Sequence, residues 1–150
     1  AAAADLFKRK VCVITKTVLS EDSAANMVAD FWLWLGMRVI YMDPQLHDRL
    51  VARSSHLPHV AAAALCHAVK QSGTMVQPVL GDGFKDTTRI AAGDAGMWTD
   101  ICMENRDELL AAIDELNQVL TQFGEHIRTN NTDAVYSFLQ EAQEWKTSET

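Results

Sequence analysis

The chain has 150 residues, of which 48% are hydrophobic and 22% charged, and its formal net charge at pH 7 is −7. This length and composition fit one globular domain or two small ones rather than a disordered chain. The negative charge argues against nucleic-acid or anionic-membrane partners, because both require a basic surface. No uncharged apolar run reaches the roughly 18 residues of a membrane span, and the N-terminal sequence AAAADLFKRK lacks the apolar core of a signal peptide.

Cysteine and glycine usage excludes further classes. The three cysteines, Cys12, Cys66 and Cys102, stand singly in apolar runs and none belongs to a CxxC pair. We therefore expect no disulfide framework, no structural zinc site and a reducing, cytoplasmic compartment. The seven glycines form neither a GxGxxG fingerprint nor a phosphate loop. The sequence by itself thus has no recognisable nucleotide site.

The first third of the chain has an α/β pattern. Residues 10–15 and 38–42 are short apolar, β-branched runs typical of buried strands. Between them, Ser20 offers an N-cap, apolar residues recur at helical spacing, and Gly36 ends the predicted helix. Strand, helix and strand with tight connections predict a parallel unit. Because two parallel strands do not form a sheet that stands alone, we expect residues 1–43 to be the remnant of a larger, truncated α/β domain.

From residue 44 onward the pattern is helical, and we expect an all-helical domain over 44–150. The expected helices cover residues 44–53, 58–71, 86–92, 94–123 and 132–146. The amphipathic helices carry more apolar surface than so small a region buries by itself. We therefore expect a homodimer, and a compact monomeric bundle remains the alternative.

Three groups of polar residues interrupt the apolar helices. The first comprises His47-Asp48 and the run SSHLPH at 54–59, in which two histidines flank Pro58 at an expected helix entrance, where free N–H groups attract anions. The second is GDGFKDTTR at 81–89, with two glycines that let a ligand approach the backbone. The third is DAGMWTD at 94–100. Metal ligation, ordinary core histidines and a solvated ion pair are the alternatives for these residues.

In order, these groups resemble the C-terminal half of the prephenate dehydrogenases, oxidoreductases of tyrosine biosynthesis. The matching residues are HD…SSHLPH…GDGFKDTTRIAAGDAGMWTDICMENRDELL, and the stretch 83–106 is long and specific. The resemblance implies a mainly α fold: a helical dimerisation domain preceded by a strand–helix–strand remnant of a Rossmann-type domain. It also implies NAD(P)-dependent oxidative decarboxylation of prephenate to 4-hydroxyphenylpyruvate.

The resemblance places substrate-binding residues on the helical domain. It implies that Arg89 holds a substrate carboxylate, because a guanidinium matches a carboxylate with two hydrogen bonds. His59 would hydrogen-bond the substrate, His47 would form a second polar wall, and Asp86 would orient Arg89 or gate the entrance. Trp98 would close the pocket from the partner subunit.

Two further residues of the motif, His56 and Ser55, are expected to contact the residues that line this pocket rather than the substrate itself. The resemblance implies that the catalytic base and the NAD or NADP site lie upstream of the first residue. The fragment alone would then be inactive.

Two alternative functions remain open. The chain could belong to an arogenate dehydrogenase, whose substrate differs from prephenate by an amino in place of a keto group, or it could be a helical dimerisation module without chemistry. The sequence does not decide between NAD and NADP or establish feedback by tyrosine.

Overall fold

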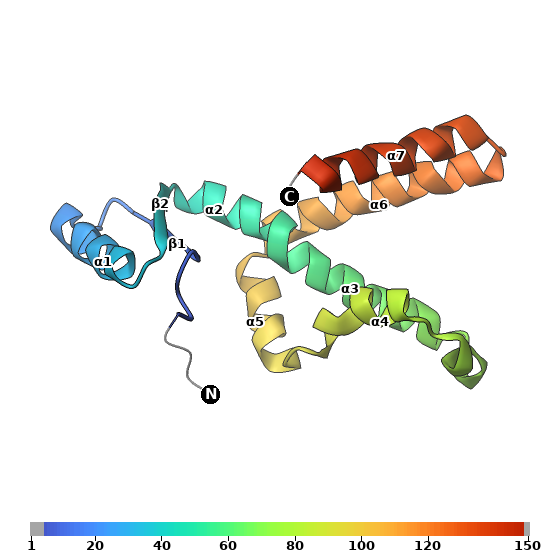
Figure 1. The fold of residues 1–150 in the computed structure, drawn as a ribbon, viewed down its shortest axis with the longest axis horizontal. Coiled ribbons are helices and arrows are strands. Elements are labelled where there is room, and N and C mark those ends of the chain that lie inside the picture. The colour runs from blue at the N-terminus through green and yellow to red at the C-terminus, as the bar shows by residue number, and fades with distance from the viewer. Residues whose placement is uncertain (1–4, 149–150) are drawn as a thin grey trace. The chain divides into compact units, whose positions relative to one another are not determined.

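The computed structural model describes residues 5–148; the N-terminal alanines 1–4 and residues 149–150, which belong to the two expected domains, lie outside the described residues. The chain divides into two compact units that meet between Asn105 and Arg106. The first unit contains a two-stranded sheet followed by helices, and the second is a pair of helices (Figure 1). The expected mainly α fold with a preceding strand–helix–strand segment is confirmed.

The strand–helix–strand segment consists of β1 (Val11–Thr15), α1 (Asp22–Trp34) and β2 (Arg38–Met42). The strands pair in parallel from Val11 opposite Arg38 to Thr15 opposite Met42. Gly36 has φ +84°, a conformation that permits the tight turn from α1 into β2. The N-cap of α1 is Glu21 rather than the expected Ser20, whose hydroxyl instead accepts a hydrogen bond from the backbone N–H of Thr17.

A long helical run follows, and it differs from the two separate helices expected. It comprises α2 (Pro44–Val51), a π-helical turn η1 (Ala52–His56) and α3 (Leu57–Lys70). Asp43 caps α2 by accepting hydrogen bonds from the N–H groups of Gln45 and Leu46. The chain does not start a new helix at Pro58, so the expected helix entrance with free N–H groups is absent there.

The π-helical turn explains how the chain passes Pro58 without a break. Proline has no N–H, and its ring clashes with the carbonyl four residues earlier in a regular α-helix. The N–H of Leu57 bonds to the carbonyl of Ala52, five residues back, which widens the turn just before the proline. α2 and α3 therefore continue into each other with a local widening at residues 52–56.

The glycine-containing segment after α3 is more helical than expected. A 3₁₀ turn η2 (Thr74–Val79) leads to α4 (Asp82–Thr88) and to a second 3₁₀ turn η3 (Arg89–Ala92). Gly83 therefore lies inside α4 rather than in a loop, and the helix expected at 86–92 begins earlier and ends as 3₁₀. Both α4 and η3 pack against α3.

The helix expected over 94–123 is divided. α5 (Ala95–Glu104) starts at Asp94, whose carboxylate accepts from the N–H of Met97, and it ends at Asn105, which has φ −112° and ψ 38°. α6 (Arg106–Arg128) belongs to the second unit and continues through Gly124, which ends no helix. α7 (Thr132–Ser148) packs against α6, with the rings of Phe123 and Phe138 4.8 Å apart.

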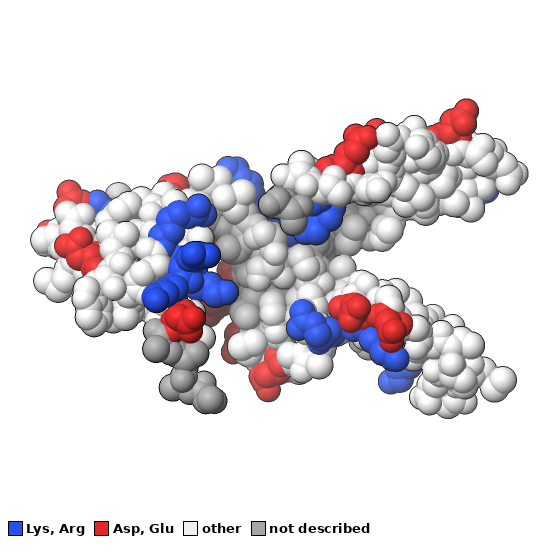
Figure 2. All heavy atoms as spheres, viewed as in Figure 1, with Lys and Arg blue, Asp and Glu red and all other residues white. Residues whose placement is uncertain are grey.

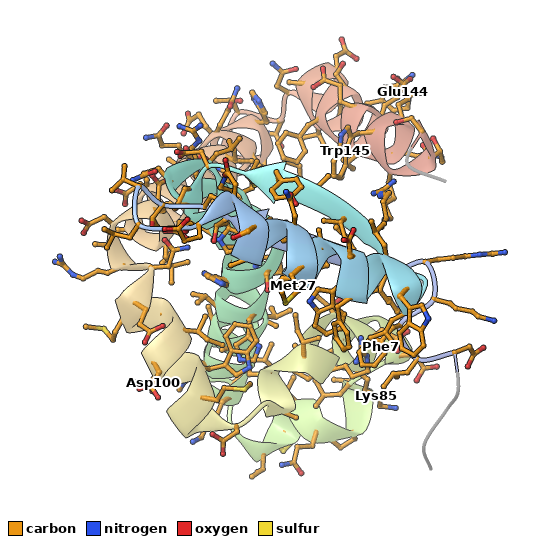
Figure 3. All side chains as sticks on the ribbon, turned by 90° about the vertical axis from the view of Figure 1, so that its left-hand side faces the viewer. Phe7, Met27, Lys85, Asp100, Glu144 and Trp145 are labelled. Carbon is orange, nitrogen blue, oxygen red and sulfur yellow. The ribbon has the colours of Figure 1, made fainter. Side chains whose placement is uncertain are left out.

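The buried core is thin. Its fully or nearly buried apolar residues are mostly alanines, and among the described residues no large side chain is completely buried. Large apolar side chains project from the helices instead: Met27 and Trp34 of α1 are 74% and 80% exposed, and Trp145 of α7 is 65% exposed. Figure 3 labels Met27 on α1 and Trp145 on α7. On the face seen in Figure 2, charged side chains lie in small groups of both signs separated by uncharged surface.

Candidate functional site

Two aromatic rings from distant parts of the sequence stack at the centre of the candidate site. His59, on α3, is only 8% exposed, and its ring lies on the indole of Trp98, on α5, with ring centroids 3.5 Å apart and planes 12° apart. His56 contacts the same indole in an edge arrangement at 6.4 Å. The spacing of His56 and His59, nearly one helical turn, puts both imidazoles on the side of the helical run that receives α5.

An open cavity of about 420 Å³ lies beside this stack. Its lining is mainly apolar and includes His59, Trp98 and the small residues Ala63, Ala91 and Gly93. A Cβ atom at Gly93 would lie 2.5 Å from the indole nitrogen of Trp98, so the glycine permits the close approach of the backbone to this ring. The stack joins two residues of the same chain, and the approach of Trp98 to a partner's pocket stays a prediction.

Arg89 and Asp86 are not among the residues that line the cavity, and they do not pair with each other. Arg89 is the first residue of η3, two positions before the cavity-lining Ala91. Both Arg89 and Asp86 are exposed, and among the described residues neither makes a hydrogen bond or an ion pair. The expected contact between them is therefore wrong for this structure; on α4 the pair that does form is Lys85 with Asp82, at 3.2 Å.

A second polar cluster connects α2, the π-helical turn and the end of α5. The ring Nδ1 of His47 lies 2.9 Å from a carboxylate oxygen of Asp48. The side-chain amide of Asn105 donates to the backbone carbonyl of Asp48 at 2.8 Å and lies 3.3 Å from Nδ1 of His56. Burial lowers the pKa of His56 below its ordinary value, the nearby His47 adds to this effect, and the carboxylate of Asp48 opposes it.

The structure thus brings together part of the expected set. The rings of His56 and His59 each contact the indole of Trp98. His47 is linked to His56 through Asp48 and Asn105. Ser55 is exposed and has no hydrogen bond among the described residues. Sequence reasoning missed Asn105: the only signal was its presence in the motif at 83–106, which does not identify what it contacts.

The described residues offer no arrangement for a metal or for a membrane span. Within residues 5–148, no group of three or more His, Cys, Asp or Glu side chains gathers at one point. None of the helices in the same range is both long and apolar enough to cross a bilayer. Cys12, Cys66 and Cys102 are free thiols.

Comparison with known proteins identifies the chain. Its fold is that of a helical dimerisation domain preceded by a strand–helix–strand unit. Residues 43–141 match the family described as the prephenate dehydrogenase dimerization domain. The chain belongs to this family, which confirms the resemblance to the prephenate dehydrogenases that the sequence motifs indicated.

Individual relatives agree with this assignment. The chain is 31% identical to cyclohexadienyl dehydrogenase of Zymomonas mobilis over 93% of its own length and 49% of the relative. It is 25% identical to prephenate dehydrogenase of Bacillus subtilis over 94% of its own length and 39% of the relative. The chain therefore spans about half or less of the curated relatives it matches.

A solved structure also matches. The crystal structure of prephenate dehydrogenase from A. aeolicus, in complex with hydroxyphenyl propionate and NAD+, superposes with a TM-score of 0.88 at 31% identity. The match covers 97% of this chain and 52% of that one.

Proposed function

We propose that this chain is the substrate-binding and dimerising part of a dehydrogenase that converts prephenate to 4-hydroxyphenylpyruvate in tyrosine biosynthesis. The observation that carries the proposal is the buried His59 stacked on Trp98 beside a cavity of about 420 Å³. Arg89, which pairs with no other described residue, stands two positions before the cavity-lining Ala91. Similarity to prephenate and cyclohexadienyl dehydrogenases supports the reaction class. Arogenate remains the alternative substrate, because nothing in the cluster selects a keto over an amino group.

In this proposal the residues divide the work of binding. Arg89 binds a substrate carboxylate, and it is available for this role because it has no ion pair among the described residues. The imidazole of His59 hydrogen-bonds the substrate, and Trp98 forms a flat wall for its ring. His47 lies further out as a second polar wall. Aromatisation drives the reaction, so the protein mainly orients the substrate and stabilises charge.

Asp86 and Ser55 receive narrower roles. Since Asp86 makes no contact with Arg89, we retain for it only the gating of the entrance, where its negative charge disfavours anions that Arg89 does not capture. Ser55 is exposed on the π-helical turn and is retained as a supporting residue of the pocket, together with His56.

The residues of this chain do not fit a dinucleotide. A dinucleotide-binding fold places its glycines between a strand and the following helix, and the connection from β1 to α1 contains no glycine. The nearest glycine, Gly36, follows α1, and a Cβ atom built on it would lie 3.3 Å from the side chain of Lys8. We propose that NAD or NADP and the catalytic base belong to a domain that precedes this chain in the same polypeptide. The parallel pair β1–β2 would complete the sheet of that domain.

We also propose that the intact protein is a homodimer. The thin core and the exposed apolar side chains of α6 and α7 support a covering surface on a partner, and the description of the family as a dimerization domain supports a second copy. A non-catalytic dimerisation module describes the isolated chain, which we expect to be inactive. The three free thiols favour the cytoplasm as the compartment.

The test is an assay of the complete gene product, encoded by the full open reading frame, with prephenate and arogenate and with NAD and NADP. We expect turnover with at least one of the four combinations. The 150-residue chain, assayed in parallel, serves as the matched control and is expected to show none. Absence of turnover with all four combinations, in a folded dimeric protein, would refute the proposed function.

A further inference from the structure

Asn105 occupies an unusual position for a residue that ends a helix. It closes α5, and its side chain reaches back to a backbone carbonyl 57 residues earlier in the sequence, that of Asp48, at 2.8 Å. A carbonyl oxygen only accepts hydrogen bonds, so the nitrogen of the amide must face it. This contact therefore fixes which way the amide of Asn105 points.

The fixed amide determines the state of His56. The same amide nitrogen lies within hydrogen-bond distance of Nδ1 of His56, at 3.3 Å. An amide nitrogen donates and does not accept. Nδ1 of His56 must therefore be the acceptor and carry no proton, which leaves the single proton of a neutral ring on Nε2.

The surroundings of His56 agree with a neutral ring. The titratable groups that act on it are His47 and Asp48, both on α2, and the uncharged indole of Trp98 packs against its edge from α5. Burial is the strongest influence on its pKa and lowers it. Within the described residues, Nε2 has no hydrogen-bond partner, so its N–H is free to donate to an oxygen of a ligand.

We propose that Asn105 is a positioning residue: it holds His56 as the neutral tautomer protonated at Nε2, against the edge of Trp98, and thereby orients the indole that stacks on His59. Asn105 touches neither the cavity nor Arg89, so it acts through His56 and Trp98. The tautomer assignment stands on the geometry alone. The consequence for substrate binding rests on the proposed function.

The tautomer can be read directly from the imidazole nitrogen chemical shifts of the 150-residue chain with isotope-labelled histidine. The His56 signals are assigned by their loss in His56→Gln. We expect an unprotonated Nδ1 and a protonated Nε2 in the wild type at neutral pH. A wild-type ring protonated at Nδ1 would overturn the proposal without any variant.

Asn105→Asp provides the decisive change, because the side chain keeps its shape but can only accept. We expect the proton of His56 to move to Nδ1 and its pKa to rise, because a carboxylate stabilises the charged ring. Asn117→Asp, at an exposed position on α6, adds the same charge and should change neither. If Asn105→Asp does not fold, Asn105→Ala takes its place and is expected to give a mixture of tautomers. An unchanged tautomer in the folded variant would refute the proposal.

Kinetics of the complete gene product separate this inference from the proposed function. We expect the KM of Asn105→Asp to rise about tenfold, because His56 and Trp98 lose the orientation that the hydrogen bond of Asn105 holds. The KM of the control Asn117→Asp should equal that of the wild type. A wild-type protein with the expected tautomer but no turnover would overturn the function and leave the assignment of Asn105 intact. Turnover with an unchanged KM in a tautomer-shifted variant would refute the positioning role alone.

Discussion

Replacement of Arg89 by alanine separates a ligand-binding role from a structural one. Arg89 is exposed and has no ion pair or hydrogen bond among the described residues, so its removal leaves no buried charge without a partner. An exposed substitution of this kind changes the free energy of unfolding by no more than about 0.5 kcal/mol. We therefore expect the melting temperature of Arg89→Ala to stay close to that of the wild type.

The effect on substrate binding should be much larger. A charge-assisted, two-point contact with a carboxylate in a partly desolvated pocket contributes on the order of 2–4 kcal/mol. Since each 1.4 kcal/mol is about tenfold, KM should rise by roughly 30- to 1,000-fold. Arg89→Lys should recover part of this loss, because an ammonium keeps the charge but not the planar pair of donors.

The assay is steady-state kinetics beside a thermal melt of the complete gene product. Arg49→Ala is the matched control, because Arg49 is an exposed arginine on α2 that makes no ion pair among the described residues. We expect its KM to remain within a few-fold of the wild type. A well-folded Arg89→Ala enzyme with an unchanged KM would contradict the reasoning, as would a marked loss of melting temperature in Arg89→Ala.

Three other predictions concern the chain itself. The purified 150-residue chain should show no dehydrogenase turnover and no nucleotide binding by calorimetry, because its β1–α1 connection lacks the glycines that a dinucleotide requires; measurable NAD binding would place the cofactor site in this chain. It should sediment as a dimer at micromolar concentration, because exposed apolar side chains on α6 and α7 need a covering surface; a monomer would be inconsistent with that argument. Its melting temperature should fall as the pH is lowered from about 7 past the ordinary pKa of 6.5, because the unfolded chain then binds a proton more readily than the partly buried His56 of the folded chain, whose pKa is lowered. His56→Gln should reduce this slope, and an equal slope in the two proteins would exclude His56 as its source.

Local signals in the sequence were sufficient for much of the fold. The β-branched runs and Gly36 correctly indicate the parallel strand–helix–strand unit, because strand composition and a left-handed glycine are properties of a few adjacent residues. Asp43 and Asp94 cap α2 and α5, which begin where the helices over 44–53 and 94–123 were expected to begin. These features depend on hydrogen bonds within one or two turns, which a sequence pattern encodes directly.

The structure differs from the sequence-based expectation where the same residues are compatible with two local conformations. Pro58 indicated a helix start, but a proline can also follow a π-helical turn, and the packing of α3 against η3 favours a continuous run. The break at Asn105 carries no glycine or proline and depends on a contact with Asp48, 57 residues away. No pattern of neighbouring residues encodes such a contact.

The candidate site shows the same limit. The motif grouped the histidines with Trp98, but the stack of His59 on the indole joins α3 to α5 and is decided by tertiary packing. The spacing of Asp86 and Arg89 permits an ion pair, and the structure contains none between them. Helical spacing establishes that two side chains are able to meet, while solvation and nearby partners, here Asp82 for Lys85, decide which pairs form.

The central claim is that a carboxylate-bearing cyclic substrate binds at the His59–Trp98 stack within reach of Arg89. A crystal structure of the complete gene product with 4-hydroxyphenylpyruvate tests it most directly. We expect the ligand ring to lie beside His59 and Trp98, with its carboxylate in hydrogen-bond contact with the guanidinium of Arg89. A ligand bound elsewhere, with Arg89 directed to solvent, would contradict it.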